Sequence, residues 1–294
     1  MYNQISRNKR NSVLLFILFF MLVGVVVYIV NMLFFGGYIF IIFAAIIAIA
    51  FALISYYSGD KIVLSMTKAK EANKKDHAYL INTVEGLCIA AGIPKPKIYV
   101  MPGQQINALA TGTSPEKASI AVTEGALQKL DRQELEGVIA HELSHIKNYD
   151  IRIMVLASVL VGIIIFISEI MLRSFIFGGL RSRDSKGGSL QIIMIVVGIA
   201  LLILAPIVAQ MIKFAISRKR EYLADASGAL LTRYPKGLAN ALRKIKSDPS
   251  EMKTASNATA HLFISNPFKK KQFLSGLFST HPNIDDRIKK LDSM

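Results

Sequence analysis

The sequence contains very little cysteine and no tryptophan. Its one cysteine, Cys88, cannot form an intrachain disulfide, so the sequence gives no sign of an oxidising compartment. It lies in an apolar run, which is typical of a small core residue and not of a nucleophile. No Gly-rich loop of the G-x-x-x-x-G-K-[ST] type is present, so an ATP-driven motor would have to be a separate partner.

Acidic residues are also scarce, and the imbalance points to lipid. The chain has 35 Lys+Arg against 20 Asp+Glu, a net charge of +15, while 52% of its residues are hydrophobic and only 19% are charged. A nucleic-acid-binding module would show a basic stripe interleaved with aromatics. Here the basic residues flank apolar runs or form short clusters such as Lys269 to Lys271, as in membrane anchors facing anionic headgroups. We therefore expect a lipid bilayer as a partner and no nucleic acid.

Four apolar runs predict transmembrane helices. Each is close to the roughly 20 residues that cross a hydrocarbon core of about 30 Å. The first is too long for a signal peptide and no small-residue cleavage site follows it, so we expect it to remain as an anchor. The runs are Val13–Phe35, Tyr38–Ile54, Ile153–Leu172 and Leu190–Ile212, and they form two hairpins.

The positive-inside rule sets the predicted topology. Basic residues before the first run place the N-terminus in the cytoplasm, and an even number of crossings returns residues 58–151 and the C-terminal part to that side. The loop 173–186 disagrees, because three Arg and one Lys against one Asp give it a charge of +3 on the outside. Either the second hairpin tolerates this violation, or the third and fourth runs do not fully cross.

The segment His141-Glu142-Leu143-Ser144-His145 is an H-E-x-x-H pattern. On a helix, residues four apart share one side, so both imidazoles can reach one ion at about 2.0–2.1 Å. Glu142 lies beside that face, where it can take a proton from a zinc-bound water as the water attacks a peptide bond. The alternative is a helix with two surface histidines and an incidental glutamate.

A catalytic zinc needs a third protein ligand and an open fourth position. Glu221, in the segment Arg218-Lys-Arg-Glu-Tyr-Leu-Ala-Asp225, is the candidate. Asp225 lies four residues further on the same face, where it can accept the free N–H of a ligating histidine and fix its tautomer. Alone, this segment is typical of a juxtamembrane charge cluster, but together with the H-E-x-x-H pattern it predicts a site for one Zn²⁺ per chain. Such a site also accepts other divalent ions.

Three segments, residues 141–150, 217–225 and 279–288, resemble the M48 family of zinc peptidases, and within it the HtpX group of bacterial membrane heat-shock proteases. The resemblance implies a zinc endopeptidase of the bacterial plasma membrane that serves the stress response and protein quality control. Its catalytic domain and both termini would be cytoplasmic, and its substrates would be damaged or misfolded membrane proteins. An oligomer is compatible with this picture.

The resemblance also implies roles for two further groups of residues. One is an edge strand beside the cleft that pairs with an extended substrate; the alternative is an ordinary strand. Its residues are Asn107, Ala108, Leu109, Ala110 and Thr111. The other is His281, which would be a fourth ligand or an oxyanion stabiliser; with Pro282 it equally suits a structural turn.

These patterns together predict a mainly α membrane protein with four apolar helices and a zincin-like α+β catalytic domain containing a small β-sheet. Its parts are an N-terminal transmembrane hairpin (1–57), a catalytic region with the H-E-x-x-H helix (58–151), a second apolar hairpin (152–213) and the C-terminal part of the catalytic domain with the third zinc ligand (214–294). Predicted strands are 97–101, 107–111 and 118–123; predicted helices are 60–91, 133–148, 218–231, 236–245 and 284–291.

Three competing functions fit the sequence less well. A processing peptidase for prenylated C-termini would need more membrane helices than four. A transporter would show internal repeats, which are absent, and a zinc-stabilised scaffold would not need Glu142. We also expect both ligand-bearing helices to continue into the neighbouring apolar runs, which would hold the zinc roughly 12–14 Å from the hydrocarbon edge.

Overall fold

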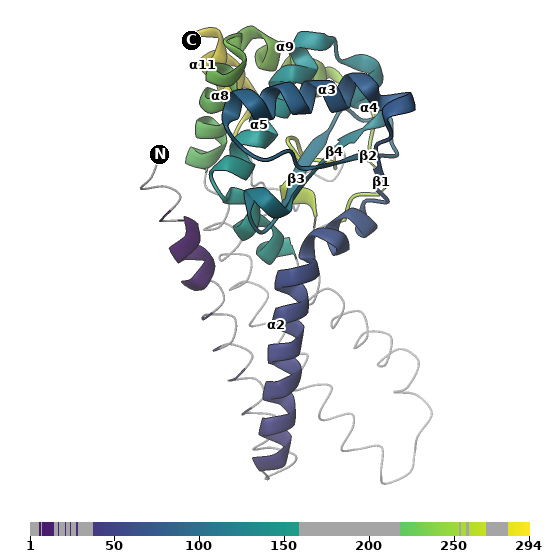
Figure 1. Ribbon diagram of the computed structural model, residues 1–294. Coiled ribbons are helices and arrows are strands. Elements are labelled where there is room, and N and C mark those ends of the chain that lie inside the picture. Colours follow the sequence, from purple (N-terminus) through teal and green to yellow (C-terminus); the bar gives the residue numbers. More distant parts are fainter. Residues whose placement is uncertain are drawn as a thin grey trace, which may run out of the picture.

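The computed structural model describes residues 6, 8–14, 17, 21, 24, 28, 38–158, 218–252, 254–256, 259–268 and 282–294. A long helix, α2 (Tyr38–Met66), projects from a body that contains the sheet and the other labelled helices (Figure 1). That body holds α3 (Lys74–Ala91), α4 (Glu124–Lys129), α5 (Arg132–Lys147), α8 (Arg218–Thr232), α9 (Pro235–Ser247) and α11 (Ile284–Asp292). Short 3-10 helices cover Pro115–Lys117 and Ala260–Leu262.

A four-stranded sheet forms one layer of the body. It is built from β1 (Lys70–Glu71), β2 (Lys97–Met101), β3 (Ala108–Gly112) and β4 (Ala118–Thr123), in the order β1-β2-β4-β3. The pair β2/β4 is parallel, with Ile98 opposite Ile120, whereas β1/β2 and β3/β4 are antiparallel. Since β3 lies at the end of this order, its outer side is an edge of the sheet.

Alternate residues of the strands serve two different cores, as the two-residue period of a strand requires. Ala108 and Ala110 of β3 join the core that α5 and α9 build, together with Ile120 and Val122 of β4. Leu109 faces the other way and packs with Ala121 and Phe263 and with the end of α2. The sheet is therefore covered on both faces, and α5 lies directly against β3.

Helix α5 packs closely on its neighbours because glycines stand at the contacts. A Cβ added to Gly137 would lie 2.6 Å from the Leu238 nitrogen of α9, and one added to Gly228 of α8 would lie 3.0 Å from the His141 nitrogen. Contacts this short cannot accommodate a side chain without a shift of the backbone. The H-E-x-x-H helix is thus held between the sheet and two helices that come from the other half of the sequence.

Most predicted elements of the catalytic region form where the patterns place them. Strands β2 and β4 have the predicted bounds, β3 is shifted by one residue, and α5, α8, α9 and α11 differ from prediction by at most two residues at an end. A capping box begins α5: Asp131 accepts from the Glu134 N–H, and the Glu134 side chain accepts from the Asp131 N–H. The region is an α+β arrangement with a small mixed sheet, as expected.

Two predictions about helices are wrong. The predicted helix 60–91 is two helices, because Lys68 takes a left-handed backbone (φ 55) and Asn73 then caps the N-terminus of α3. The H-E-x-x-H helix also does not continue into the third apolar run. It ends at Lys147, Tyr149 takes φ 59, and a new helical segment covers 150–158.

The four predicted membrane helices are only partly within the described residues. The second run, 38–54, forms the first part of α2, while the other three lie wholly or mostly outside the described residues. Among the residues that are described, no helix combines the length and the hydropathy that crossing a bilayer requires. The number of apolar helices stays a prediction.

Candidate metal centre and active site

Helix α5 brings His141, Glu142 and His145 into the interior. Their exposed fractions are 1%, 2% and 3%, although all three are polar. The apolar stripe of this helix, which runs from Leu135 to Ile146, is buried in the core and fixes the rotation of the helix. The two imidazoles consequently point to one place, with their Nε2 atoms 3.2 Å apart and their ring planes at 85°.

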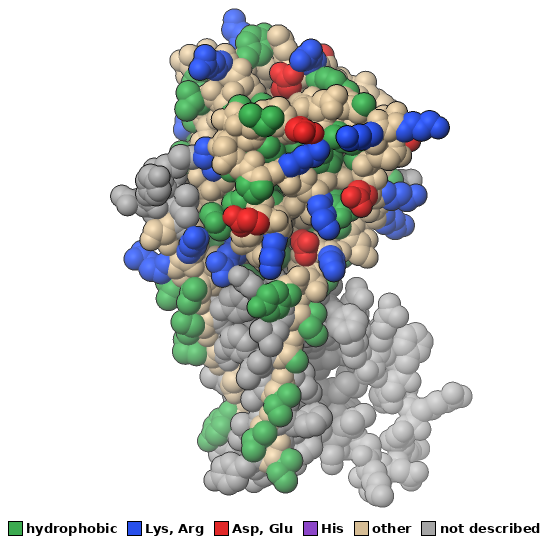
Figure 2. All heavy atoms as spheres, in the orientation of Figure 1, with side chains coloured by type: hydrophobic (Ala, Val, Ile, Leu, Met, Phe, Trp, Pro, Cys, Tyr) green, Lys and Arg blue, Asp and Glu red, His purple; other side chains and the backbone are tan. Residues whose placement is uncertain are grey.

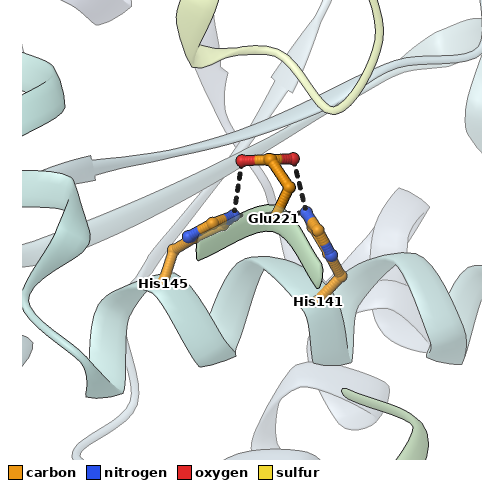
Figure 3. A group of neighbouring side chains, drawn as sticks. All are labelled: His141, His145 and Glu221. Carbon is orange, nitrogen blue, oxygen red and sulfur yellow. Dashed lines mark hydrogen bonds and ion pairs between the residues drawn. The ribbon is translucent and has the colours of Figure 1, made fainter. Parts of the chain in front are cut away.

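Glu221 of α8 faces both histidines (Figure 3). Its Oε2 lies 3.7 Å from the His141 Nε2, and its Oε1 lies 3.5 Å from the His145 Nε2. One ligand atom from each of the three residues lies within 4.8 Å of the others. Three donors that each stand about 2.0–2.1 Å from a tetrahedral zinc are separated by about 3.3 Å. The donor set therefore fits a zinc ion in identity, number and spacing.

Each histidine has a carboxylate on its other ring nitrogen. The Nδ1 of His141 lies 2.9 Å from the Asp225 Oδ1, and the Nδ1 of His145 lies 3.1 Å from the Asp150 Oδ2. A carboxylate in this position holds the proton on Nδ1 and leaves the Nε2 lone pair free for a metal. The sequence predicted this contact for Asp225, whereas Asp150 was not predicted as part of the site.

Arg287 of α11 holds Asp225 with two hydrogen bonds. Its Nε donates to Oδ2 at 2.9 Å and its Nη2 to Oδ1 at 2.7 Å, a bidentate arrangement. The same guanidinium donates to the Ile264 carbonyl at 3.1 Å and lies 3.7 Å from the Glu221 Oε2. This side chain is 2% exposed, so its charge is neutralised by buried carboxylates and not by water.

Arg287 was not predicted either, although the sequence carries a signal for it. Ile284, Ile288 and Leu291 form the apolar face of a short helix, and an arginine at position 287 falls on that same face. A charge on an apolar face indicates a buried partner.

The buried groups titrate differently because their neighbours differ. Burial lowers the pKa of His141, and the hydrogen bond with Asp225 only partly opposes this. Burial alone would also lower the pKa of His145, but Asp150 and Glu221 outweigh it and raise the pKa to about 9. Burial would raise the pKa of Asp225, but Arg287 outweighs it and lowers the pKa to about 2.

Glu142 is a buried carboxyl group of the site, and its pKa is close to neutrality. Burial raises the pKa of its carboxyl to about 7, against the positive charge of His145 and a hydrogen bond from the backbone of Ala110. A carboxyl group with a pKa near the working pH can both take up and return a proton. The bond to Ala110 also shows that Glu142 faces strand β3.

Strand β3, predicted to pair with substrate, is at the edge of the sheet, and part of that edge is already used. Phe263 forms an isolated antiparallel bridge to Leu109, and the Ile264 N–H donates to the Ala108 carbonyl at 3.0 Å. Asn107 is buried and donates to the Ser265 carbonyl. His281 lies outside the described residues.

The sequence model of Peptidase family M48 matches residues 74–294, which include every residue of the site described above. This chain belongs to peptidase family M48. As an M48 peptidase it is a metallopeptidase, a hydrolase of peptide bonds.

The relatives of this M48 peptidase match it over its whole length. It is 47% identical to the "Protease HtpX homolog" of Caldanaerobacter subterraneus subsp. tengcongensis, covering 100% of this chain and 98% of that one. Identity to the "Protease HtpX homolog" of Dictyoglomus thermophilum is 45%, with 100% and 94% covered, and to that of Listeria monocytogenes 43%, with 100% of both covered. The crystal structure of S. mikatae Ste24p has a similar fold, with a TM-score of 0.52 at 19% identity over 99% of this chain and 67% of that one.

Proposed function

We propose that this M48 peptidase is a zinc-dependent endopeptidase that cleaves damaged or misfolded membrane proteins at the cytoplasmic face of a bacterial plasma membrane. The observation that carries the proposal is the convergence of His141, His145 and Glu221, with Glu142 buried beside them on the same helix. A scaffold would need the three ligands alone. Glu142 is buried beside the three ligands and is not one of them, which supports turnover instead.

In this proposal His141, His145 and Glu221 hold the ion, and Asp225 and Asp150 hold the two imidazole rings in the ligating tautomer. When bound, zinc supplies Lewis acidity, which lowers the pKa of a water ligand from 15.7 towards about 7 and polarises the peptide carbonyl. Glu142 accepts the proton at its carboxylate and passes it to the leaving amine. Burial keeps bulk water away from this carboxylate, which strengthens its electrostatic interactions.

The proposed substrate is an extended peptide that pairs with the edge of β3. Pairing through backbone groups gives affinity with little sequence selectivity, which suits unfolded substrates. The hydrogen bond between Ala110 and Glu142 supports this placement, because a peptide on that edge passes next to the base. Since Phe263 bridges Leu109, a substrate strand uses the edge beyond that bridge, towards Thr111 and Gly112.

The proposed location at a membrane is supported by apolar side chains outside the body. Ile39, Ile42 and Ile46 lie three and four residues apart on α2 and are 82%, 60% and 59% exposed. Figure 2 shows such hydrophobic side chains along the projecting part and Lys and Arg side chains on the body next to it. An exposed apolar row beside basic residues is the arrangement of a membrane anchor. The partners proposed for this protein are therefore the lipid bilayer, which would surround these apolar side chains, and membrane-protein substrates within it.

The decisive experiment compares wild type with Glu142→Gln, purified in detergent with zinc and given an unfolded test protein. The substitution removes the base and leaves the three ligands. We expect zinc to bind to both proteins and the rate of cleavage to fall by at least about a hundredfold in the variant. Glu136→Gln is the matched control, because Glu136 lies on the same helix and pairs with Arg132 at 3.0 Å near the surface; it should cleave like wild type. Equal cleavage by wild type and Glu142→Gln contradicts the proposed role of Glu142 as the base. Failure of the wild-type protein to bind zinc contradicts the metal site.

A further inference from the structure

The segment that leads into the first apolar run reaches the metal centre. Residues 8–14 are helical, and Asn8 is only 3% exposed although the sequence around it is polar and basic. Its side-chain Nδ2 donates to the Asp150 Oδ1 at 2.7 Å and to the Asn148 carbonyl at 2.8 Å. Asp150 is the carboxylate that accepts from His145. A residue far from the H-E-x-x-H helix in sequence is thus one hydrogen bond away from the partner of a metal ligand.

The chemistry at Asn8 fixes the orientation of its amide. Both neighbours, a carboxylate and a carbonyl, are acceptors, so only the NH₂ group can face them. Both protons of that group are used. A carboxylate at this position would repel Asp150, and a side chain without donors would leave two buried acceptors without this partner.

Neighbouring contacts hold the segment in place. The Ser12 hydroxyl donates to the Asn8 carbonyl at 2.9 Å, which fixes the helical turn after Asn8. The Lys9 ammonium lies 4.4 Å from the centre of the Tyr149 ring. Tyr149 is the residue with positive φ that separates α5 from the helical segment 150–158. The N-terminal segment therefore docks on the turn that presents Asp150 to His145.

The two halves of the metal centre are built in parallel. His141 is oriented by Asp225, and Arg287 holds Asp225 through two donors. His145 is oriented by Asp150, whose Oδ2 faces the ring. The Oδ1 of Asp150 accepts from Asn8 and lies 3.6 Å from the Arg220 Nε. Asn8 thus has the place next to Asp150 that Arg287 has next to Asp225.

We propose that Asn8 is a positioning residue of the metal centre, which orients His145 through Asp150 and so couples metal affinity to the docking of the N-terminal segment. This inference rests on the metal site proposed above. Asn8 touches neither metal nor substrate. It restricts the Asp150 carboxylate to one rotamer, and that rotamer directs the Nε2 of His145 towards Glu221 and His141. Without this restraint all three ligands are still present, but the imidazole ring of His145 can rotate away from its ligating orientation.

The test measures metal binding by the full-length chain in detergent, with Zn²⁺ in competition with a chromophoric chelator and with Co²⁺ as a spectroscopic probe. Asn8→Ala removes the donors, and Asn8→Asp keeps the shape and adds a repelling charge. We expect both to weaken Zn²⁺ binding on the order of tenfold, with the larger loss in Asn8→Asp. This is the low end of the about 10–100-fold range for groups that hold a metal ligand directly, because Asn8 acts on His145 through Asp150. The Co²⁺ absorption spectrum should change as well, since its bands report ligand geometry.

Controls separate positioning from folding. Asn11→Ala makes the same change three residues along the same helical segment and should leave affinity and spectrum unchanged. In an Asp150→Ala background, adding Asn8→Ala should have no further effect on affinity, because the two residues act through one contact.

The outcomes distinguish the inference from the proposed function. Wild-type affinity and spectrum in both Asn8 variants overturn the role of Asn8 while leaving the metal centre intact. Full additivity of Asn8→Ala and Asp150→Ala likewise overturns it. A wild type that binds neither Zn²⁺ nor Co²⁺ overturns the metal centre itself.

Discussion

At the scale of single residues, the metal centre contains buried charges that neutralise one another. Arg287, Asp225 and Glu221 are each at most 2% exposed, so none is stabilised by bulk water. Removing one partner of such a set costs far more than removing a surface pair, because a charge is left buried and uncompensated. The shape of the guanidinium matters too, since it matches both oxygens of Asp225 at once.

Arg287→Lys tests that match. A lysine keeps the charge but can reach only one Asp225 oxygen well, so we expect Zn²⁺ affinity to fall about tenfold or more. Chelator competition measures this. Arg243→Lys is the control, because Arg243 pairs with Asp292 near the surface, where both side chains are about half exposed; it should bind Zn²⁺ like wild type. Unchanged affinity in Arg287→Lys would show that charge alone orients Asp225.

Asp248, outside the metal centre, gives a prediction about pH. Burial alone would raise the pKa of its carboxyl, but the Ile106 N–H and the Lys129 ammonium outweigh burial and hold the pKa at about 2. The ordinary value is about 3.9. A lowered pKa in the folded state means that ionised Asp248 stabilises the fold fully above about pH 4, and that this contribution is lost as the pH falls towards 2.

Asp248→Asn should therefore lower the free energy of unfolding by about 1–3 kcal/mol at pH 7. The difference from wild type should shrink as the pH falls from about 4 to about 2. Unfolding by denaturant at several pH values measures both. The control Asp292→Asn removes an exposed ion pair and should cost less than about 1 kcal/mol. A difference that stays constant down to pH 2 contradicts the assignment to ionised Asp248.

The three candidate ligands that the structure brings together could be picked from sequence, but most of the residues that contact them could not. His141, His145 and Glu221 lie in short patterns with helical spacing, and Asp225 shares a helix with Glu221, so local geometry alone links them. Asp150 and Arg287 carry weaker signals, a carboxylate after the helix and a charge on an apolar face. Asn8 carries none, because its contact with Asp150 spans 142 residues and exists only in the folded chain.

At the scale of elements, α5 is fixed by close helix packing. Gly137 meets the backbone of α9, Gly237 of α9 in turn meets the Gln133 carbonyl of α5, and Gly228 of α8 meets the backbone at His141. Small residues at these contacts let the helix axes approach, and the approach sets how far Glu221 reaches towards the histidines. Packing between elements thus determines the spacing of the metal ligands.

Gly137→Ala tests this packing. The added Cβ would lie 2.6 Å from the Leu238 nitrogen, which is backbone and cannot rotate away, so we expect a loss of about 1–3 kcal/mol in stability. Gly86→Ala is the matched control on α3, where nothing lies within 4 Å of the added carbon. It should stabilise the protein by about 0.5–1 kcal/mol through helix propensity. Thermal unfolding of both variants checks the pair; equal effects would contradict the role of the close contact.

The strands and most helices of the body could be predicted because, along each of them, the spacing of apolar residues in the sequence matches the face that is buried. The break at 67–73 was missed, although this segment has no large apolar side chain and Asn73 is a typical N-cap residue. Lys68 takes its left-handed backbone so that β1 can pair with β2, and that pairing is a tertiary contact. The break at Tyr149 was missed for the same reason. It serves to aim Asp150 at His145, which no pattern within the helix requires.

At the scale of the whole molecule, a bound ion would join two halves of the sequence. The ligands come from α5 and α8, which lie on either side of residues 159–217 in the chain. A ligand that binds only the folded state stabilises it, by about 2.7 kcal/mol when its free concentration is 100 times its Kd. Removal of metal by a chelator should therefore lower the temperature of unfolding, and added Zn²⁺ should restore it. Identical unfolding with and without metal would contradict a site that spans α5 and α8.

The scarcity of cysteine allows a direct test of the proposed topology. Burial raises the pKa of the Cys88 thiol to about 11, and the side chain is 3% exposed, so it should react little with thiol reagents. Lys75→Cys and Lys236→Cys each place a single exposed thiol on one part of the catalytic domain. A membrane-impermeant reagent should label neither in intact cells and both after lysis. Labelling in intact cells would place the catalytic domain outside.

The long separations within the metal centre also set an order in time. A ribosome makes Asn8 first and the H-E-x-x-H helix much later, and Arg287 follows His141 by a further 146 residues. While that stretch is being made, the growing chain carries two histidines without their third ligand and an Asp225 without its guanidinium. A metal centre assembled in this order is complete only after α11 has been synthesised and has docked.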